Sequence, residues 1–272
     1  MQELATGQRV NVPSDDPAAA AADVQNQAFQ SQTDQYLQNT SSLESMLQNA
    51  DSVLSSVVTS LNQAISLGVQ GANGTLSSAD QQTIAQQIQS IQSQIVQLAN
   101  SSYQGSYIFG GTETQSAPYA LDSAKPDGVT YSGNTGVNSV EIAPGQSMKV
   151  NLPGSQIFQG AGGDVMGSLQ QLITALQSGN STSIGTATNQ VTTALNYVSE
   201  QRVFYGSAVD QLNANQSSLQ QEQVNLQTQQ NNLVGANMAT VATDLSQAQT
   251  EQSATLAALA QIIPQSLLSY LK

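Results

Sequence analysis

The sequence predicts a mainly α-helical protein, built from long helices with a heptad pattern and a small β-domain inserted between them. Over much of the chain, apolar residues recur at alternating spacings of three and four, which is the seam of packed helices. Between about residues 105 and 163 this pattern gives way to Tyr, Val, Thr and Gly with period-two alternation and four prolines. With 272 residues, the chain can form more than one compact unit.

The first long helix is expected to begin at Pro17. Ser-Asp-Asp at residues 14–16 supplies capping side chains, and proline fits the first helical turn. Two adjacent carboxylates such as Asp15 and Asp16 can bind a divalent cation, but before a proline they are more typical of a helix cap. The seam that follows consists of Tyr36, Thr40, Leu43, Leu47, Ala50, Leu54, Val57, Leu61 and Ala64.

Glycine and asparagine at residues 71–74 are expected to break this helix soon after Val69. A second helix restarts at residues 76–80, so the two form a helical hairpin. The seam of the second helix is Ile84, Ile88, Ile91, Ile95 and Leu98.

The β-domain is expected to contain short strands separated by proline–glycine turns. Met148, Val150 and Leu152 alternate with polar residues, which predicts a strand over 148–152. Pro-Gly pairs at residues 144–145 and 153–154 predict turns. The glycine-rich segment 105–111 lacks the Gly-Lys-Ser/Thr sequence that ends a phosphate-binding loop. We therefore interpret this segment as a helix-to-sheet junction.

Helix is predicted to return from Asp164 to Ser178, and a much longer helix follows. In this longer helix, apolar residues recur at every seventh position: Ile184, Val191, Val198, Tyr205, Leu212, Leu219, Leu226 and Leu233. A helix of about 50 residues would be about 75 Å long. Periodicity alone leaves open whether its far end packs within the chain or faces another subunit.

A final helix after Gly235 carries Met238, Val241 and Leu245 on one face, followed by an apolar tail at residues 262–271. An apolar segment of this kind, if exposed, marks an interaction site.

The composition excludes several classes of function. Lys, Arg, Asp and Glu make up 8% of the chain, against about 25% in an average soluble domain. Five basic residues stand against 18 acidic ones, a net charge of −13, so neither nucleic acid nor an anionic membrane is an expected partner. The sequence has neither the pattern of a cleaved signal peptide nor a run of 18 apolar residues.

The chain has no His and no Cys, which excludes Ser-His-Asp and Cys-His catalysis and the usual zinc and iron–sulfur sites. No acid–base pair can be assembled from the remaining carboxylates by sequence alone. We therefore expect a protein that is not an enzyme, with no catalytic, cofactor-binding or metal-binding residues.

Two terminal motifs resemble the flagellin superfamily. Leu-Ala-Thr-Gly-Gln-Arg-Val-Asn at residues 4–11, before the Asp-Asp helix cap, is similar to the Leu-x-x-Gly-x-Arg-Ile-Asn loop of those proteins. Asp244, Gln249, and residues 259–261 and 264–268 are similar to their C-terminal helix. Tyr-Ile-Phe-Gly-Gly-Thr at residues 107–112 resembles the hook–filament junction members of the superfamily. These members normally have a further stretch of helix before the Leu-x-x-Gly loop, which leads us to expect an unpaired apolar tail here.

The resemblance implies a flagellin-like domain organisation. Residues 1–14 and 236–272 would form part of the terminal, inner-core region. Residues 15–104 and 164–235 would form the helical rod domain, and residues 105–163 the inserted β-domain. Assembly contacts would involve the loop residues Gly7, Arg9 and Asn11 and the tail residues Leu267, Leu268 and Leu271. For Arg9 the alternative is a simple solvated charge, and for the leucines it is packing within the chain's own bundle.

The implied function is a structural adaptor: a junction-ring subunit that connects the hook to the flagellin filament. Its implied partners are hook-associated protein 1, flagellin, copies of itself, a flagellar export chaperone and the type III export apparatus. The implied location is the extracellular flagellum, reached by the flagellar type III route without a cleaved signal peptide.

Three alternatives remain open at the level of sequence. The chain could be flagellin itself, which would polymerise into long filaments. It could be a flagellin-like enzyme carrying a peptidase insert, although the lack of His argues against the usual zinc site. It could also be a receptor-binding module whose contact surface is the β-domain.

Overall fold

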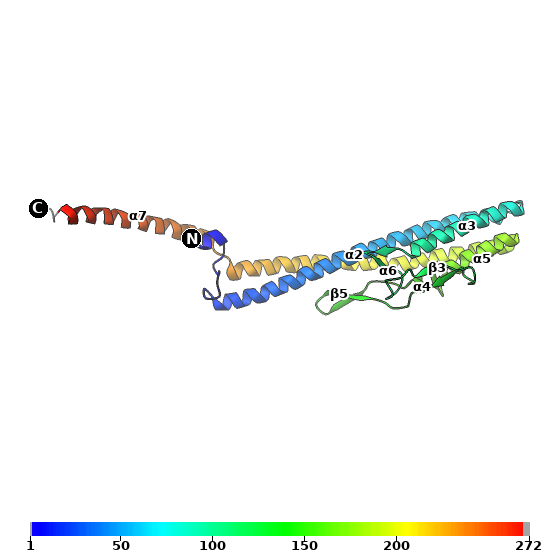
Figure 1. Cartoon of the computed structure of the whole chain (residues 1–272), viewed down its shortest axis with the longest axis horizontal. Helices are drawn as coiled ribbons and strands as arrows, with labels where there is room; N and C mark the ends of the chain where they lie inside the picture. The colour runs from blue at the N-terminus through cyan, green and yellow to red at the C-terminus, as the bar shows by residue number, and fades with distance from the viewer. Residues whose placement is uncertain (1, 269–272) are drawn as a thin grey trace. The chain divides into compact units, whose positions relative to one another are not determined.

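The structure, a computed structural model, describes the backbone of residues 2–268 and the side chains of residues 3–260. It consists of two compact units, shown in Figure 1 within one chain trace. We call the unit formed by Met1–Gln35 and Gln220–Lys272 the terminal unit, and the unit formed by Tyr36–Leu219 the central unit.

The predicted helices are confirmed, with boundaries close to those expected. The helices are α1 (Gln2–Thr6), α2 (Pro17–Gly71), α3 (Ser78–Ala99), α4 (Gly154–Phe158), α5 (Val165–Ser178), α6 (Ser181–Val234) and α7 (Met238–Leu268). Ser77 caps α3 by accepting a hydrogen bond from the Asp80 amide, and the Asp80 carboxylate accepts one from the Ser77 amide in return. Gly179 ends α5 in the left-handed conformation, where glycine is least strained.

The core of the central unit is an apolar seam between helices. From α2, Leu47, Leu54 and Leu61 are fully buried, and Ile88 and Ile95 of α3 are fully buried as well. These side chains belong to one hydrophobic cluster that includes residues of α5 and α6. The heptad spacing therefore corresponds to buried positions, as predicted.

The far end of the seven-residue repeat packs within the chain. In the central unit Ile184, Tyr205 and Leu212 have no exposed surface, and Leu219 is 6% exposed. In the terminal unit Leu226 is still only 5% exposed. The repeat is thus covered by the chain's own helices at least as far as Leu226.

Two contacts hold α2 and α6 together within the central unit. Gly68 lies so close to Thr188 that a Cβ added to Gly68 would overlap the threonine hydroxyl. The Arg202 guanidinium donates two hydrogen bonds to Asp51, with Nε–Oδ1 and Nη2–Oδ2 distances of 2.8 and 3.0 Å. These hydrogen bonds raise the pKa of Arg202, although partial burial opposes the shift.

The segment between α3 and α5 is built from short antiparallel strand pairs. Among the described residues these pairs are β1 (Ser102–Tyr103) with β2 (Ser106–Tyr107), β3 (Tyr119–Leu121) with β4 (Val129–Tyr131), β5 (Ser139–Ala143) with β6 (Gln146–Lys149), and β7 (Gln159–Gly160) with β8 (Gly163–Asp164). The predicted β character of this segment is confirmed, and the helix-to-sheet junction lies where it was expected.

Two details of the β segment differ from the prediction. The strand predicted over 148–152 ends at Lys149, because the buried Asn151 donates to the Gly111 carbonyl and accepts from the Asn138 amide at 2.7 Å. The Pro-Gly pair at 153–154 does not form a simple turn. Pro153 instead precedes the short helix α4, whose Ile157 and Phe158 are buried.

An aromatic cluster forms the centre of the β segment. The rings of Phe109 and Tyr119 both meet Phe158 edge-on, with centroid distances of 5.4 and 5.6 Å. Tyr131 lies 4.9 Å from Tyr119 between ring centroids. Burial raises the pKa of Tyr119, so this phenol remains protonated.

One helix in the described part of the chain is long and apolar enough to cross a membrane by composition alone. It is α2, in which an 18-residue window reaches a mean hydropathy of 1.2. The buried helix of a helical bundle passes the same test, and Leu43, Leu47, Leu54 and Leu61 of α2 are buried in the core.

Candidate assembly surfaces

The loop between α1 and α2 is fastened to the end of α6. The Arg9 guanidinium donates to the Leu233 carbonyl at 3.0 Å and to the Asp16 carboxylate at 3.2 Å. The Arg9 amide also donates to the Val234 carbonyl at 2.7 Å. Because the last carbonyls of a helix have no partner within it, Arg9 satisfies groups that would otherwise need water.

The two acidic residues of the loop are engaged by backbone amides. Asp15 Oδ2 accepts from the Asn11 and Val12 amides, each at 3.0 Å. Asp16 Oδ1 accepts from the Ala19 amide at 3.0 Å, which is the helix cap predicted for α2. This backbone bond, followed by the bond from Arg9, lowers the pKa of Asp16.

Gly7 and Asn11 shape the loop. Gly7 has φ of +68°, which is strained for residues with a Cβ, and its carbonyl accepts from the Ala236 amide at 3.0 Å. The Asn11 side chain donates to the Gln8 carbonyl at 2.9 Å. The structure thus brings Gly7, Arg9 and Asn11 together in one fold-stabilising loop beside the α6–α7 junction.

Helix α7 exposes its apolar side chains. Met238, Leu256 and Leu259 are 49%, 60% and 48% exposed, and every described residue from 246 to 260 is exposed. Leu267 and Leu268 fall within α7, but their side chains lie outside the described residues, and Leu271 lies outside them altogether. Exposed apolar side chains along one helix are typical of an interaction surface.

The Tyr-Ile-Phe-Gly-Gly-Thr element joins α3 to the β segment. Phe109 is fully buried, and its carbonyl accepts from the Gly154 amide at 2.8 Å and from the Tyr131 hydroxyl at 3.1 Å. A Cβ at Gly110 would overlap the Glu113 carbonyl oxygen. The element is therefore a structural junction. Packing accounts for both the buried aromatic ring of Phe109 and the glycine at position 110.

The described residues contain no group of three or more His, Cys, Asp or Glu side chains that could hold a metal ion. Asp122 is typical of the isolated carboxylates. It accepts from the Ala124 amide at 3.0 Å and the Thr130 hydroxyl at 2.8 Å, and these bonds lower its pKa. Such carboxylates stabilise turns and caps.

Two contacts of structural weight are absent from the sequence-based predictions. One is the Arg202–Asp51 pair between α6 and α2. The other is the close packing of the Tyr197 ring against three glycines. A Cβ on Gly160, Gly162 or Gly163 would overlap the tyrosine side chain. The Tyr197 hydroxyl donates to the Gln156 carbonyl at 3.0 Å. Three glycines within four residues were the available signal for such a close approach.

Comparison with known protein families identifies both ends of the chain. Residues 1–114 match the model of the bacterial flagellin N-terminal helical region. Residues 188–271 match that of the bacterial flagellin C-terminal helical region. The two matches flank the second half of the β segment and α5.

Two curated relatives carry the name flagellar hook-associated protein 3. The protein from Escherichia coli K12 is 34% identical over 158 residues, which cover 58% of this chain and 48% of the relative. The protein from Salmonella typhimurium is 35% identical over the same length and the same shares. The chain thus spans about half the length of these relatives.

Solved structures share the fold. A flagellar hook-associated protein-3 from Legionella pneumophila superposes with a TM-score of 0.69 at 14% identity, covering 76% of this chain and 98% of the other. The FlgL protein of Bacillus cereus gives a TM-score of 0.63 at 23% identity, covering 77% and 99%. The mainly helical fold with a small β insertion is therefore one that these proteins share.

Proposed function

The chain belongs to the flagellin superfamily, and on this premise we propose that it is a structural adaptor of the bacterial flagellum. In this role it is a subunit of the junction ring that connects the hook, through hook-associated protein 1, to the flagellin filament. The observation that carries the proposal is the 34–35% identity to two proteins named flagellar hook-associated protein 3.

Two structural features support an adaptor. The central unit has a continuous apolar core of its own, so it can act as a stable body without a partner. The terminal unit exposes the apolar side chains of α7. A protein that joins two assemblies needs both a stable body and a surface left open for contact.

The proposed axial contact uses α7, including the tail leucines Leu267, Leu268 and Leu271. The loop residues Gly7, Arg9 and Asn11 act indirectly in this proposal, by holding the loop beside the start of α7. Arg9 and Gly7 are hydrogen-bonded to residues 233–236 beside the start of α7, and Asn11 bonds to the Gln8 carbonyl within the loop. We therefore assign these three residues a positioning role in assembly, since their described contacts lie within the chain.

The remaining parts of the proposal follow from this role. The partners are hook-associated protein 1, flagellin, further copies of the chain, an export chaperone and the type III export apparatus. The location is the extracellular flagellum at the hook–filament junction, reached without a cleaved signal peptide. The role requires no catalysis, cofactor, nucleic acid or membrane.

Deletion of the gene tests the junction role. We expect cells that retain hooks, lack filaments and release flagellin into the medium, and we expect the full-length gene to restore filaments. Normal filaments on the deletion strain would overturn the proposal.

The flagellin alternative has a separate test. Purified flagellin polymerises when it is nucleated, whereas a junction subunit is expected to stop at monomers or short rings. Long filaments of the purified chain in negative-stain images would favour flagellin.

A further inference from the structure

The turn between α2 and α3 contains the one Asn-Gly pair of the sequence, Asn73-Gly74. Both residues are exposed. The backbone nitrogen that follows an asparagine can attack the carbonyl carbon of the asparagine side chain, and glycine hinders that attack least because it has no Cβ. An exposed Asn-Gly pair is therefore a candidate site of spontaneous covalent modification.

The backbone of the turn is held on both sides of Asn73. The Asn73 amide donates to the Gln70 carbonyl, and the Leu76 amide donates to the Asn73 carbonyl, each at 3.1 Å. The second bond closes a β-turn in which Gly74 takes the second position, whose amide the turn does not use. Among the described residues the Gly74 amide has no hydrogen-bond partner. The attacking nitrogen is thus free, while the residue that it attacks is fixed.

Thr75 holds and polarises the Asn73 side chain. The Asn73 Oδ1 atom accepts from the Thr75 hydroxyl at 2.9 Å and from the Thr75 amide at 3.2 Å. Two donors on one carbonyl oxygen stabilise the negative charge that develops there when a nucleophile adds to the carbon. The turn therefore contains a nucleophile, a polarised amide and a leaving group that is open to water.

The turn has room for a larger residue at position 74. A Cβ added to Gly74 would meet no atom within 4 Å, and the φ of Gly74 lies outside the left-handed region. Neither packing nor backbone strain therefore requires glycine here. What glycine does supply is an unhindered amide nitrogen.

The chain's one Asp-Gly pair, Asp127-Gly128, lacks these features. The Gly128 amide donates to the Lys125 carbonyl at 3.1 Å, so its nitrogen is engaged. The Asp127 Oδ2 atom accepts from the Gln159 side chain at 2.6 Å. A carboxylate is also a poorer target for a nucleophile than an amide, because it carries a negative charge.

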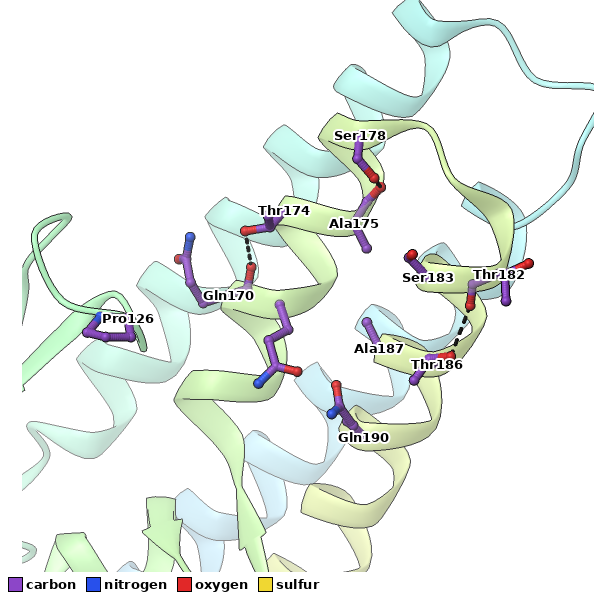
Figure 2. Close-up of a pocket in the computed structure, with 11 residues that line it drawn as sticks. Pro126, Gln170, Thr174, Ala175, Ser178, Thr182, Ser183, Thr186, Ala187 and Gln190 are labelled. Atoms are coloured by element: carbon purple, nitrogen blue, oxygen red, sulfur yellow. Dashed lines mark hydrogen bonds between the residues drawn. The ribbon is translucent and has the colours of Figure 1, made fainter.

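The turn between α5 and α6 provides a second contrast. Figure 2 shows this turn between the labelled residues Ser178 and Ser183. Asn180 lies in it and caps α6, because its Oδ1 accepts from the Ser183 amide at 3.1 Å. The residue after Asn180 is Ser181, whose side chain hinders attack by its nitrogen. Asn180 is therefore a matched internal reference for Asn73.

We propose that Asn73 is a site of spontaneous deamidation, in which Gly74 supplies the nucleophile and Thr75 activates the amide. The Gly74 nitrogen forms a bond to Asn73 Cγ and gives its proton to solvent water. The Cγ–Nδ2 bond breaks, and ammonia leaves after taking a proton from water, which gives a cyclic succinimide. Water then adds to either carbonyl carbon of the ring and opens it to aspartate or isoaspartate. The net reaction consumes one water and releases one ammonia, without oxidation or reduction.

The reaction changes both the charge and the backbone of the turn. It adds a negative charge to the stretch 52–79, which contains no charged residue. In the isoaspartate product the main chain runs through the former side chain, so the Leu76 amide loses the carbonyl that closes the turn. We expect faster amide exchange at residues 74–77 of that product. The inference does not rest on the junction role.

Incubation of the purified full-length chain at physiological temperature and pH, followed by peptide mapping with mass spectrometry, tests the proposal. Conversion at Asn73 is expected to be at least about ten times as fast as at Asn180, with both aspartate and isoaspartate formed. Gly74→Ala is expected to slow the conversion about tenfold, because its Cβ hinders the nitrogen yet fits the turn.

Thr75→Val separates the effect of the turn from that of the Asn-Gly pair alone. It removes the hydroxyl donor while keeping the shape of the side chain, and we expect conversion about threefold slower, the effect of one exposed hydrogen bond. Thr75→Ser keeps the donor and is the matched control, with a rate close to that of the unmodified chain. In urea-unfolded chains all three are expected to convert at the same rate, because the turn is absent.

An Asn73 amide that stays intact after Asn180 has converted would overturn the proposal. Equal rates for folded Thr75→Val and the unmodified chain would overturn it as well, because Thr75 would then take no part in activation. A Gly74→Ala chain that unfolds at the same urea concentration as the unmodified chain, and still converts at the same rate, would show that the Gly74 nitrogen is not the nucleophile.

Discussion

The central and terminal units use the same two helices, α2 and α6, but fill the space between them differently. In the central unit, Leu54 and Leu61 of α2 and Val198 of α6 are fully buried carbon side chains. In the terminal unit, Asn26 and Thr33 occupy buried positions of α2. Burial of a leucine stabilises a fold by about 2 kcal/mol, whereas a satisfied hydrogen bond contributes about 1 kcal/mol.

Asn26 makes the contrast sharper. Its side-chain amide donates to the Leu226 carbonyl at 2.9 Å, but its Oδ1 is buried without a hydrogen-bond partner. Nearby, Gln30 Nε2 donates to Gln230 Oε1 at 3.1 Å. The lesson is that helix formation alone does not set stability. Two segments of one helix can be equally helical and still differ in how firmly they are held.

The largest expected effect is loss of an apolar side chain in the central unit. Leu61→Ala removes a fully buried side chain and is expected to lower the free energy of unfolding by about 3 kcal/mol. Urea unfolding followed by tyrosine fluorescence measures it, because every tyrosine except Tyr270 lies in the central unit.

The matched variant is Leu226→Ala, the same change at a buried position of the terminal unit. We expect it to leave the tyrosine transition unchanged and to speed amide exchange in residues 220–234 only. Equal shifts of the tyrosine transition in both variants would contradict the difference between the units.

The junction element of the central unit offers the next largest effect. Gly110→Ala places a Cβ against the Glu113 carbonyl and is expected to destabilise the unit by about 1–3 kcal/mol. Gly185→Ala is the control, because its Cβ would meet open space within α6. That change is expected to stabilise the chain by about 0.5–1 kcal/mol. The same urea titration measures both variants. If Gly110→Ala and Gly185→Ala changed the free energy of unfolding equally, the close contact at Gly110 would not be what requires a glycine there.

In the terminal unit, Asn26→Leu is expected to stabilise rather than destabilise. The substitution removes the buried, unpaired Oδ1 and adds apolar contact, for a gain of about 1 kcal/mol. Slower amide exchange around residues 222–230 would show it. Faster exchange there would mean that the bond to Leu226 contributes more than the unpaired oxygen costs.

The smallest expected effect concerns the pH dependence of the loop. The folded pKa of Asp16 lies below its unfolded value of 3.8, so its contribution is present above that value and is lost as pH falls through the folded pKa. Arg9→Gln is expected to move the folded pKa of Asp16 back toward 3.8. NMR titration of the Asp16 carboxyl measures this, and an unchanged pKa would mean that the Ala19 bond alone sets it.

The helices could be predicted from sequence because their signals are local. Proline and Asp16 mark the start of α2, Gly179 marks the end of α5, and the seven-residue repeat marks α6. The end of β6 and the existence of α4 could not be predicted. They depend on Asn151 and Phe158 meeting residues far away in the chain, such as Gly111 and Phe109.

In the candidate surfaces, too, the local sequence predicts some features, whereas others depend on contacts between residues far apart in the chain. The motif identified Arg9 as a residue of interest, but only the structure shows that its guanidinium reaches the Leu233 carbonyl, 224 residues away.

The pairing of α3 with α5 also has a consequence for how fast the chain folds. Gln92 and Gln170 meet although they are 78 residues apart, so α5 docks only after the β segment has looped back. The α2/α3 hairpin needs no such closure, because local contacts form before distant ones. We expect stopped-flow tyrosine fluorescence to resolve a hairpin phase before a slower docking phase. An insertion in the β segment would then slow the second phase alone.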